Sequence, residues 1–202
     1  MKASVVVALI LTACLAVQPV WSQKKEKEQF FMDVHKLEPN SVTYADVAGA
    51  HELDLKTQEK HGVSFITYWV DAEQGYVYCL SKAKDESHVH GTHEEAHGLV
   101  PEGIYEVIAG EQENYTGNGF LFLDIHELGP GNVTAEAVGE AHQKDLATQG
   151  EYKVNFINYW VDEKSGKVFC LSEAPDKDAV IATHQHAHGL VPAKVLSVKQ
   201  GQ

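Results

Sequence analysis

The sequence is poor in cysteine and in basic residues. Only 3 of its 202 residues are Cys, which is too few for a fold stapled by disulfides. Its 16 Lys plus Arg are outnumbered by 29 Asp plus Glu, which leaves a formal net charge of −13. Nucleic-acid binding needs clustered basic side chains, so this balance argues against a nucleic-acid partner and favours cationic partners. The sequence also shows neither a glycine-rich phosphate loop nor a Ser-His-Asp pattern.

One long apolar run is present, over residues 4–17 near the N-terminus. It is short for a membrane span, and Val20 and Ser22 are acceptable residues at the −3 and −1 positions of a cleavage after Ser22. We therefore predict a signal peptide at 1–22 and a charged tether at 23–29. Residues 11–14 also resemble a bacterial lipoprotein box, which would instead leave Cys14 as a lipid anchor. Both interpretations predict an exported protein, periplasmic or extracellular, with no membrane span.

The rest of the chain consists of two copies of one segment. Residues 30–107 and 121–198 align at a constant offset of 91 without a gap, and 38 of the 78 aligned positions are identical. An ungapped alignment of this length and identity does not arise by chance, so the chain is a tandem repeat. We predict repeat 1 over 30–108 and repeat 2 over 120–198. The segment 109–119 is rich in Gly, Glu and Asn and is predicted to be a linker.

Each repeat is predicted to have the element order β-α-β-β-α-β. In repeat 1 the expected elements are a strand at 30–35, a helix at 43–61, a hairpin at 63–70 and 76–80, a helix at 87–99 and a strand at 104–108. This is the ferredoxin-like arrangement, of the α+β class. Its helices cover one sheet face only, so the aromatic other face needs a cover. We expect the two repeats to cover each other as an intramolecular α+β barrel; a swapped homo-oligomer is the alternative.

Candidate metal ligands begin with an Asp-x-His pair on the first strand. Asp33 and His35 return as Asp124 and His126, and residues two apart share one strand face. The alternate residues are apolar and suit the helix-packed core, so we expect both pairs to face the barrel interior and meet there. An enclosed carboxylate is costly unless it is paired or metal-bound, and imidazole with carboxylate suits Zn, Ni, Cu or Fe. The alternative is an Asp-His hydrogen bond that only stabilises the sheet.

A histidine pair also recurs on the second helix. His93 and His97 return as His184 and His188, and a spacing of four places each pair on one helix face. That spacing can chelate a metal, although a His at a helix C-terminus also favours the helix dipole. The His-Glu-x-x-His order of repeat 1 matches the zinc-protease pattern, but repeat 2 lacks the Glu and the unit is small for such a cleft.

Two further repeated pairs lie at positions typical of a core. His51 and His142 lie on an apolar helix stripe and are weaker candidate ligands. Cys79 and Cys170 lie mid-strand among apolar neighbours. They are predicted to be small buried core residues, with a metal ligand or a disulfide as the alternatives.

With these residues in place, each copy resembles a small family of bacterial nickel-binding domains. The resemblance rests on Asp-Val-His at 33–35, Ala-His at 50–51, Tyr-Trp-x-Asp at 68–71, Val-x-Cys-Leu at 77–80 and His-x-x-Ala-His-Gly-Leu-Val at 93–100, with their repeats. It covers nearly all of both repeats. It implies ferredoxin-like domains that pair as α+β-barrel dimers, so that the tandem is a fused pseudo-dimer. It also implies Ni²⁺ as the bound metal, with the Asp-x-His and helical His pairs as ligands.

Three functions follow from these observations. The first is an exported binding protein for a divalent transition metal, Ni²⁺ or alternatively Zn²⁺ or Cu²⁺, that acts as a buffer, sensor or donor. The second is a small enzyme, monooxygenase- or isomerase-like, that encloses an organic ligand in the barrel; this rests on analogy of fold alone. The third is a structural or interaction module whose histidines are hydrogen-bonded core residues.

Overall fold

A computed structural model describes residues 28–202 of the chain. The predicted signal peptide, its cleavage site and Cys14 lie outside the described residues. Within residues 28–202, no helix combines the length and the apolar character that crossing a bilayer requires.

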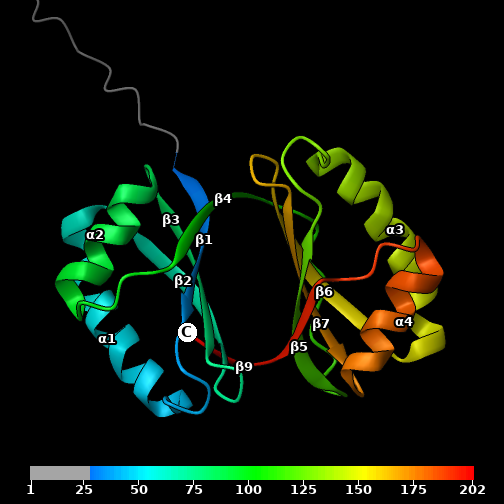
Figure 1. Ribbon diagram of the computed structural model, residues 1–202, viewed down its shortest axis with the longest axis horizontal. Coiled ribbons are helices and arrows are strands. Elements are labelled where there is room, and N and C mark those ends of the chain that lie inside the picture. The colour runs from blue at the N-terminus through cyan, green and yellow to red at the C-terminus, as the bar shows by residue number, and fades with distance from the viewer. Residues whose placement is uncertain (1–27) are drawn as a thin grey trace, which may run out of the picture.

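The described residues form two β-α-β-β-α-β repeats (Figure 1). The elements of repeat 1 are β1 (Gln29–Lys36), α1 (Tyr44–His61), β2 (Ser64–Asp71), β3 (Tyr76–Ala83), α2 (Glu86–Ala96) and β4 (Gly103–Ala109). The elements of repeat 2 are β5 (Phe120–Glu127), α3 (Ala135–Tyr152), β6 (Asn155–Asp162), β7 (Lys167–Ala174), α4 (Lys177–Ala187) and β8 (Lys194–Ser197), followed by β9 (Lys199–Gly201). The predicted order of elements is therefore confirmed.

All nine strands belong to one sheet, in the order β8-β5-β7-β6-β4-β1-β3-β2-β9. Its two outermost strands, β8 and β9, are separated in sequence by Val198 alone. The sheet therefore returns on itself, and the two repeats form an intramolecular α+β barrel. The helix pair α1 and α2 covers the outside of one half and α3 and α4 the outside of the other (Figure 1).

The barrel interior is a packed apolar core. Side chains from both repeats meet there, and the rings of Trp69 and Trp160 approach with centroids 5.2 Å apart. The core comprises Met32, Val34, Trp69, Tyr78, Leu80, Val107, Leu123, Ile125, Ile157, Trp160, Phe169, Leu171, Leu196 and Val198. Burial of this much apolar surface is the main favourable term that joins the repeats. The barrel interior of the described residues is therefore filled by side chains.

Local sequence signals set the ends of the helices. Thr43 caps α1, and its side chain and that of Asp46 satisfy each other's backbone N–H groups in a capping box. Gly62, with φ of 65°, ends the helix in the left-handed conformation that glycine tolerates best. The helix α2 ends at Ala96 rather than at Leu99 as predicted, because the chain turns at Gly98 with φ of 77°.

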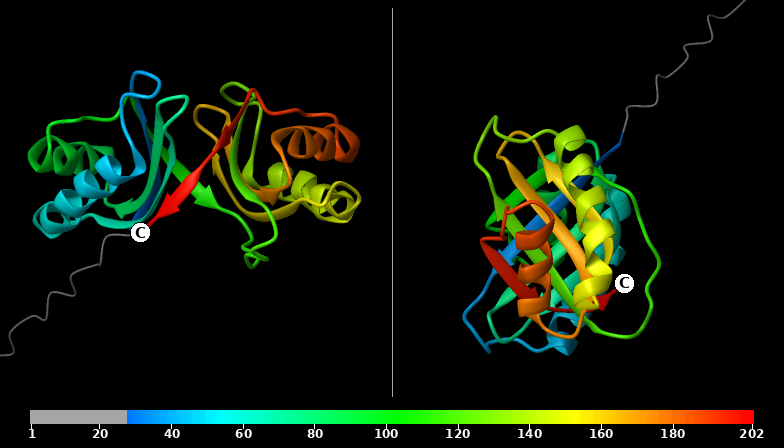
Figure 2. Two further views of the ribbon diagram at one scale, coloured as in Figure 1. Left: turned by 90° about the horizontal axis from the view of Figure 1, so that it is seen from below. Right: turned by 90° about the vertical axis from the view of Figure 1, so that its right-hand side faces the viewer.

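Each repeat extends its last strand into the sheet of the other (Figure 2). Ile108 and Ala109 of β4 pair with β6, and β9 pairs with β2 through the equivalent positions. Gly110 and Gly201, which are also 91 residues apart, lie against the rings of Tyr159 and Tyr68. A Cβ at either glycine would overlap that ring, so close contact between the exchanged strands requires glycine at both positions.

We expect Gly110→Ala and Gly201→Ala each to lower the free energy of unfolding by about 1–3 kcal/mol, since an added Cβ overpacks a buried ring. Thermal or urea unfolding of the purified variants measures this. Gly49→Ala is the matched control, because a Cβ there meets no atom within 4 Å inside helix α1. That change should raise stability slightly. Equal stability of all three variants would contradict the assigned role of the strand exchange.

Candidate metal centre

The repeated Asp and His residues form one cluster in each repeat, between the sheet and its helices. Asp33 and His35 project from β1 toward the helices, whereas Met32 and Val34 project into the barrel core. The prediction that the Asp-x-His pairs face the barrel and share one space is therefore wrong. Both faces of β1 are buried, so alternation of polar and apolar residues could not tell which face meets the helices. The barrel core separates the two clusters.

In repeat 1, a buried histidine lies between two buried carboxylates. Nδ1 of His93, on α2, donates to Oδ1 of Asp54, on α1, over 3.0 Å. Its Nε2 lies 3.5 Å from Oδ2 of Asp33. Asp33, Asp54 and His93 are each at most 3% exposed. Three elements, β1, α1 and α2, thus contribute one Asp-His-Asp chain that is almost completely buried.

Two further histidines complete the cluster of repeat 1. Nε2 of His35 lies 3.3 Å from Oδ1 of Asp33, and its ring stands edge-on to that of His93 with centroids 4.9 Å apart. Nε2 of His97 donates to Oδ2 of Asp54 over 3.3 Å. The backbone N–H of Leu99 donates to Nδ1 of His97 over 3.1 Å, so that nitrogen is an acceptor and the proton of His97 resides on Nε2.

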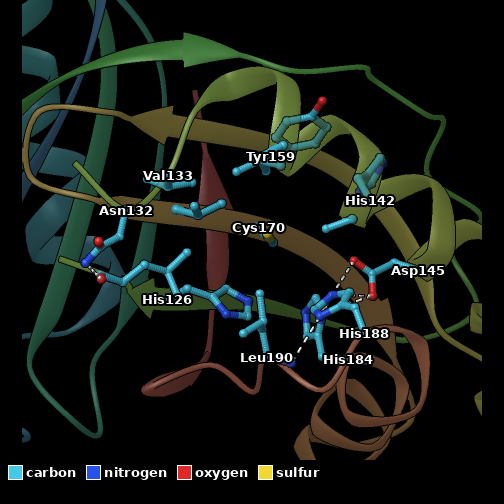
Figure 3. Close-up of a pocket in the computed structure, with 15 residues that line it drawn as sticks. His126, Asn132, Val133, His142, Asp145, Tyr159, Cys170, His184, His188 and Leu190 are labelled. Atoms are coloured by element: carbon cyan, nitrogen blue, oxygen red, sulfur yellow. Dashed lines mark hydrogen bonds and ion pairs between the residues drawn. The ribbon is translucent and has the colours of Figure 1, made fainter. Parts of the chain in front are cut away.

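Repeat 2 reproduces this arrangement at equivalent positions. His184 donates to Asp145 over 3.0 Å and lies 3.4 Å from Asp124. The remaining two histidines complete it: Nε2 of His126 is 3.2 Å from Asp124, and Nε2 of His188 donates to Asp145 over 3.3 Å. Figure 3 shows His184 and His188 converging on the carboxylate of Asp145. The cluster is therefore a property of the repeat and not of one position in the chain.

Imidazoles supply the positive charge in both clusters, since the chain contains no Arg and no Lys lines either site. Burial disfavours a charged His93, but Asp33 and Asp54 outweigh it and raise its pKa to about 10. Burial likewise opposes an ionised Asp33, but the adjacent imidazoles hold its pKa at about 2. His184 and Asp124 behave in the same way, with pKa values of about 10 and about 2. Without metal, each cluster therefore holds a proton on its central histidine.

Each cluster contains buried ligand atoms that lack a hydrogen-bond partner. Oδ1 of Asp33, both carboxylate oxygens of Asp124 and Nε2 of His184 are buried and lack a hydrogen-bond partner within the described residues. In repeat 1 the thiol of Cys79 also belongs to the group, because Cys79 pairs with Asp33 across β1 and β3. Nitrogen, carboxylate oxygen and sulfur donors in a closed space suit Ni, Zn or Cu. The residues present therefore fit a divalent transition metal.

Comparison with known proteins gives this arrangement a family. The model of the family described as nickel responsive protein SCO4226-like matches residues 31–107 and again residues 122–198. The chain belongs to the SCO4226-like family. A crystal structure of SCO4226 from Streptomyces coelicolor A3(2) is 34% identical over 41% of this chain and 99% of that one, with a TM-score of 0.38.

Solved structures outside the SCO4226-like family share the fold alone. A mutant chlorite dismutase from Candidatus Nitrospira defluvii is 9% identical over 87% of this chain and 91% of that chain, with a TM-score of 0.51. The same organism's chlorite dismutase in complex with imidazole covers 86% of this chain and 90% of its own, at 9% identity and a TM-score of 0.50. A search of curated proteins finds no match.

The structure of this SCO4226-like protein brings all eight predicted ligands into the two clusters, four to each repeat. Two cluster members were missed from the sequence: Asp54 and Asp145 recur at the offset of 91 but were not proposed as ligands. Their position three residues after His51 and His142 was the available signal, since residues three apart share a helix face. The weaker candidates His51 and His142 lie near the clusters, outside the groups whose donor atoms converge.

Cys79 and Cys170, the cysteines of the two repeats, are buried and free. Burial raises the pKa of both thiols well above its usual value, and the nearby Asp33 adds to this at Cys79. Both belong to the apolar cores beneath the helices, as the sequence predicted. A disulfide between them, one of the alternatives, is not formed. Cys79 lies in the ligand group of repeat 1, whereas Cys170 is not part of the corresponding group.

The stability of the metal-free protein should depend on pH through these clusters. The pKa of His93 and His184 is raised above its unfolded value, so their contribution is complete below about pH 6.5 and is lost as the pH rises toward about 10. The lowered pKa of Asp33 and Asp124 makes their contribution complete above about pH 4 and lost toward pH 2. Stability should therefore be greatest from about pH 4 to 6.5.

Urea unfolding in chelator at pH 5.5, 7.5 and 9 tests this expectation. The wild-type chain should lose stability over that range, and His93→Gln/His184→Gln should lose much less, because glutamine does not titrate. His90→Gln, at an exposed position on α2, is the control and should follow the wild type. Parallel slopes for all three proteins would contradict the protonated state assigned to the central histidines.

Proposed function

We propose that this SCO4226-like protein is an exported binding protein for a divalent transition metal, nickel in the first place, with one site in each repeat. The observation that carries the proposal is a buried carboxylate in each repeat whose hydrogen bonding is incomplete. Oδ1 of Asp33 and both oxygens of Asp124 lack a hydrogen-bond partner among the described residues, although imidazole nitrogens lie 3.2–3.4 Å from Oδ1 of each. Burying such oxygens is costly without a cation beside them. Nickel is proposed because the family is described as nickel responsive and a relative 34% identical belongs to it.

Two overlapping groups compete for the metal in repeat 1, and they share His93. One contains Asp33, His35 and Cys79, and the other contains Asp54 and His97. The first group uses Nε2 of His93 and the second uses Nδ1. The hydrogen bonds favour the first group, because it contains the unpaired carboxylate oxygen, whereas the hydrogen bonds of Asp54 and His97 are already satisfied.

Asp54 and His97 are therefore assigned a supporting role. Asp54 accepts the Nδ1 proton of His93 and so directs Nε2 toward Asp33, which is how a carboxylate orients a metal-binding histidine. His97 holds the other oxygen of Asp54 and is itself fixed by the Leu99 backbone. By the same division, the ligands in repeat 2 are Asp124, His126 and His184. Asp145 and His188 have the supporting role there.

The export proposal rests on residues 1–22, whose sequence suits a cleaved signal peptide. A protein outside the cytoplasm with two buried, fully proteinaceous sites suits a role as metal buffer, sensor or donor. Detection of the protein in the periplasmic or culture fraction, with an N-terminus at Gln23, would support export. An uncleaved N-terminus in the cytoplasmic fraction would overturn it without affecting the metal sites.

Calorimetric titration of the chelator-treated protein with Ni²⁺ tests the assignment. We expect two Ni²⁺ per chain in the wild type, one in Asp33→Asn or Asp124→Asn, and none in the double variant. Circular dichroism checks that the variants fold, and His35→Gln/His126→Gln provides a second pair that removes a ligand without altering the carboxylates. Absence of Ni²⁺ binding to the folded wild type would overturn the proposed function.

Variants of the supporting residues separate the two overlapping groups. His97→Gln/His188→Gln should keep two Ni²⁺ per chain and weaken each by about 10–100-fold, as expected for residues that orient ligands. His90→Gln/His186→Gln, at exposed positions, should change nothing. Loss of stoichiometry in the His97 and His188 variant, with retention in the Asp33 and Asp124 variant, would move the metal to the other group.

Metal binding should also release protons, because the raised pKa of His93 keeps its ring protonated at neutral pH. The apparent affinity for Ni²⁺ should rise about tenfold per pH unit for each proton displaced, between pH 6 and 8. Titrations in buffers of different ionisation enthalpy count these protons. An affinity independent of pH would contradict ligation by His93 and His184.

A further inference from the structure

Each repeat has a cavity on the helix side of the sheet, beside its cluster. The cavity in repeat 1 has a volume of ≈ 110 Å³ and that in repeat 2 ≈ 120 Å³. Both are bounded by the first helix of the repeat, its two hairpin strands and the turn that follows its second helix. Equivalent residue pairs line both: Val47 and Val138, Ala50 and Ala141, Tyr68 and Tyr159, Val77 and Val168, Leu99 and Leu190. The cavity is therefore built by the repeat itself.

The volume and the lining of the cavities indicate the size and the polarity of a ligand that would fit. Aliphatic and aromatic side chains form most of the surface. In repeat 1 the polar lining comes from Asp46, His51 and Asp54 on α1 and from the cluster histidines His35, His93 and His97. An apolar cavity of about 150 Å³ accommodates benzene. The cavities are smaller than this, at ≈ 110 and ≈ 120 Å³, and therefore suit an organic molecule no larger than a single ring.

A buried histidine that lacks a partner lines each cavity. His51 is 5% exposed and His142 is 4% exposed, and neither ring forms a hydrogen bond within the described residues. Nδ1 of His51 and Nε2 of His142 are sealed from solvent, so the other nitrogen of each ring is the one available to a molecule in the cavity. No interaction line reaches His142 in Figure 3. The rings instead pack on Tyr68 and Tyr159, with centroids 4.6 Å apart in both repeats. A buried imidazole without a hydrogen bond is costly, so this pair points to a polar group on the ligand.

The charged groups that line the cavities select against anions. Asp54 lines the cavity of repeat 1 and Asp145 that of repeat 2, and burial lowers the pKa of His51 and His142, which favours neutral rings there. A neutral imidazole offers one donor and one acceptor. A hydroxyl or an N–H group on an uncharged molecule satisfies it, whereas a carboxylate would meet the negative charge of the cluster.

We propose that each repeat binds a small uncharged organic molecule with one ring and a hydroxyl or N–H group. Its body lies against Ala50, Tyr68 and Leu99, and its polar group pairs with His51; Ala141, Tyr159, Leu190 and His142 do the same in repeat 2. Proposed metal ligands also line the cavities, His35 and His93 in repeat 1 and His126 and His184 in repeat 2, but the cavities exist without metal, so the inference stands apart from the metal proposal.

Titration of the chelator-treated full chain with phenol, followed by amide chemical shifts, tests the proposal without metal. Phenol is uncharged at neutral pH and carries one ring and one hydroxyl. We expect saturable shifts in residues that line both cavities, and binding of benzoate weaker by at least about tenfold because of its charge. Absence of saturable shifts, or equal affinity for benzoate, would overturn the proposal.

Cavity-filling variants locate the bound molecule. Ala50→Leu/Ala141→Leu places bulk in both cavities and should abolish phenol binding. Ala45→Leu makes the same change at an exposed position of α1 and should leave binding intact. Phenol binding that persists in the filled variant would overturn the location.

The role of the unpaired histidines is tested by comparing two probes. His51→Phe/His142→Phe keeps a ring of similar size and removes both hydrogen-bonding nitrogens. Phenol affinity should fall about fivefold relative to toluene affinity, which is the loss expected for one hydrogen bond. Equal changes for phenol and toluene would overturn the pairing of the polar group with His51 and His142.

Discussion

The structure depends on two carboxylates buried in each repeat and held by a histidine between them. Asp33 and Asp54 have no arginine or lysine nearby, so the imidazolium of His93 supplies the compensating charge. Such a chain is stable only while its protons or a cation remain in place, because a buried charge without a partner is strongly destabilising. A divalent metal and a proton therefore compete for the same place, and the site couples metal binding to protonation.

The two clusters lie at equivalent positions of the two repeats, and the apolar core of the barrel separates them. Exchange of strand ends, fixed by Gly110 and Gly201, closes the sheet, and the aromatic core around Trp69 and Trp160 fills its interior. The Asp and His clusters and the cavities therefore lie on the outer faces of the sheet, beneath the helices. Each repeat forms its cluster and its cavity from its own elements. One chain thereby presents two similar sites. Among the described residues, Cys79 belongs to the donor group of repeat 1, whereas Cys170 is not part of the corresponding group of repeat 2.

The repeats, the element order and the residues of the cluster could be predicted from the sequence because they are local. A constant offset exposes the repetition, and capping residues and alternation expose the elements. The face occupied by Asp33 could not be predicted, since both faces of β1 are buried and periodicity does not say which one meets the helices. Asp54 was missed because a lone aspartate on a helix becomes a partner only when another helix packs beside it.

The sequence by itself determined that this protein is a tandem of α+β repeats rich in paired Asp and His residues. The tertiary structure decided that these residues form two separate clusters, that Asp54 and Asp145 orient the central histidines, and that His51 and His142 line cavities without a partner. The physical reason is that charge pairing, burial and empty space arise between elements distant in sequence. The sequence gives the residues of each helix and strand directly. Which residues of other elements they contact is decided only when the elements pack.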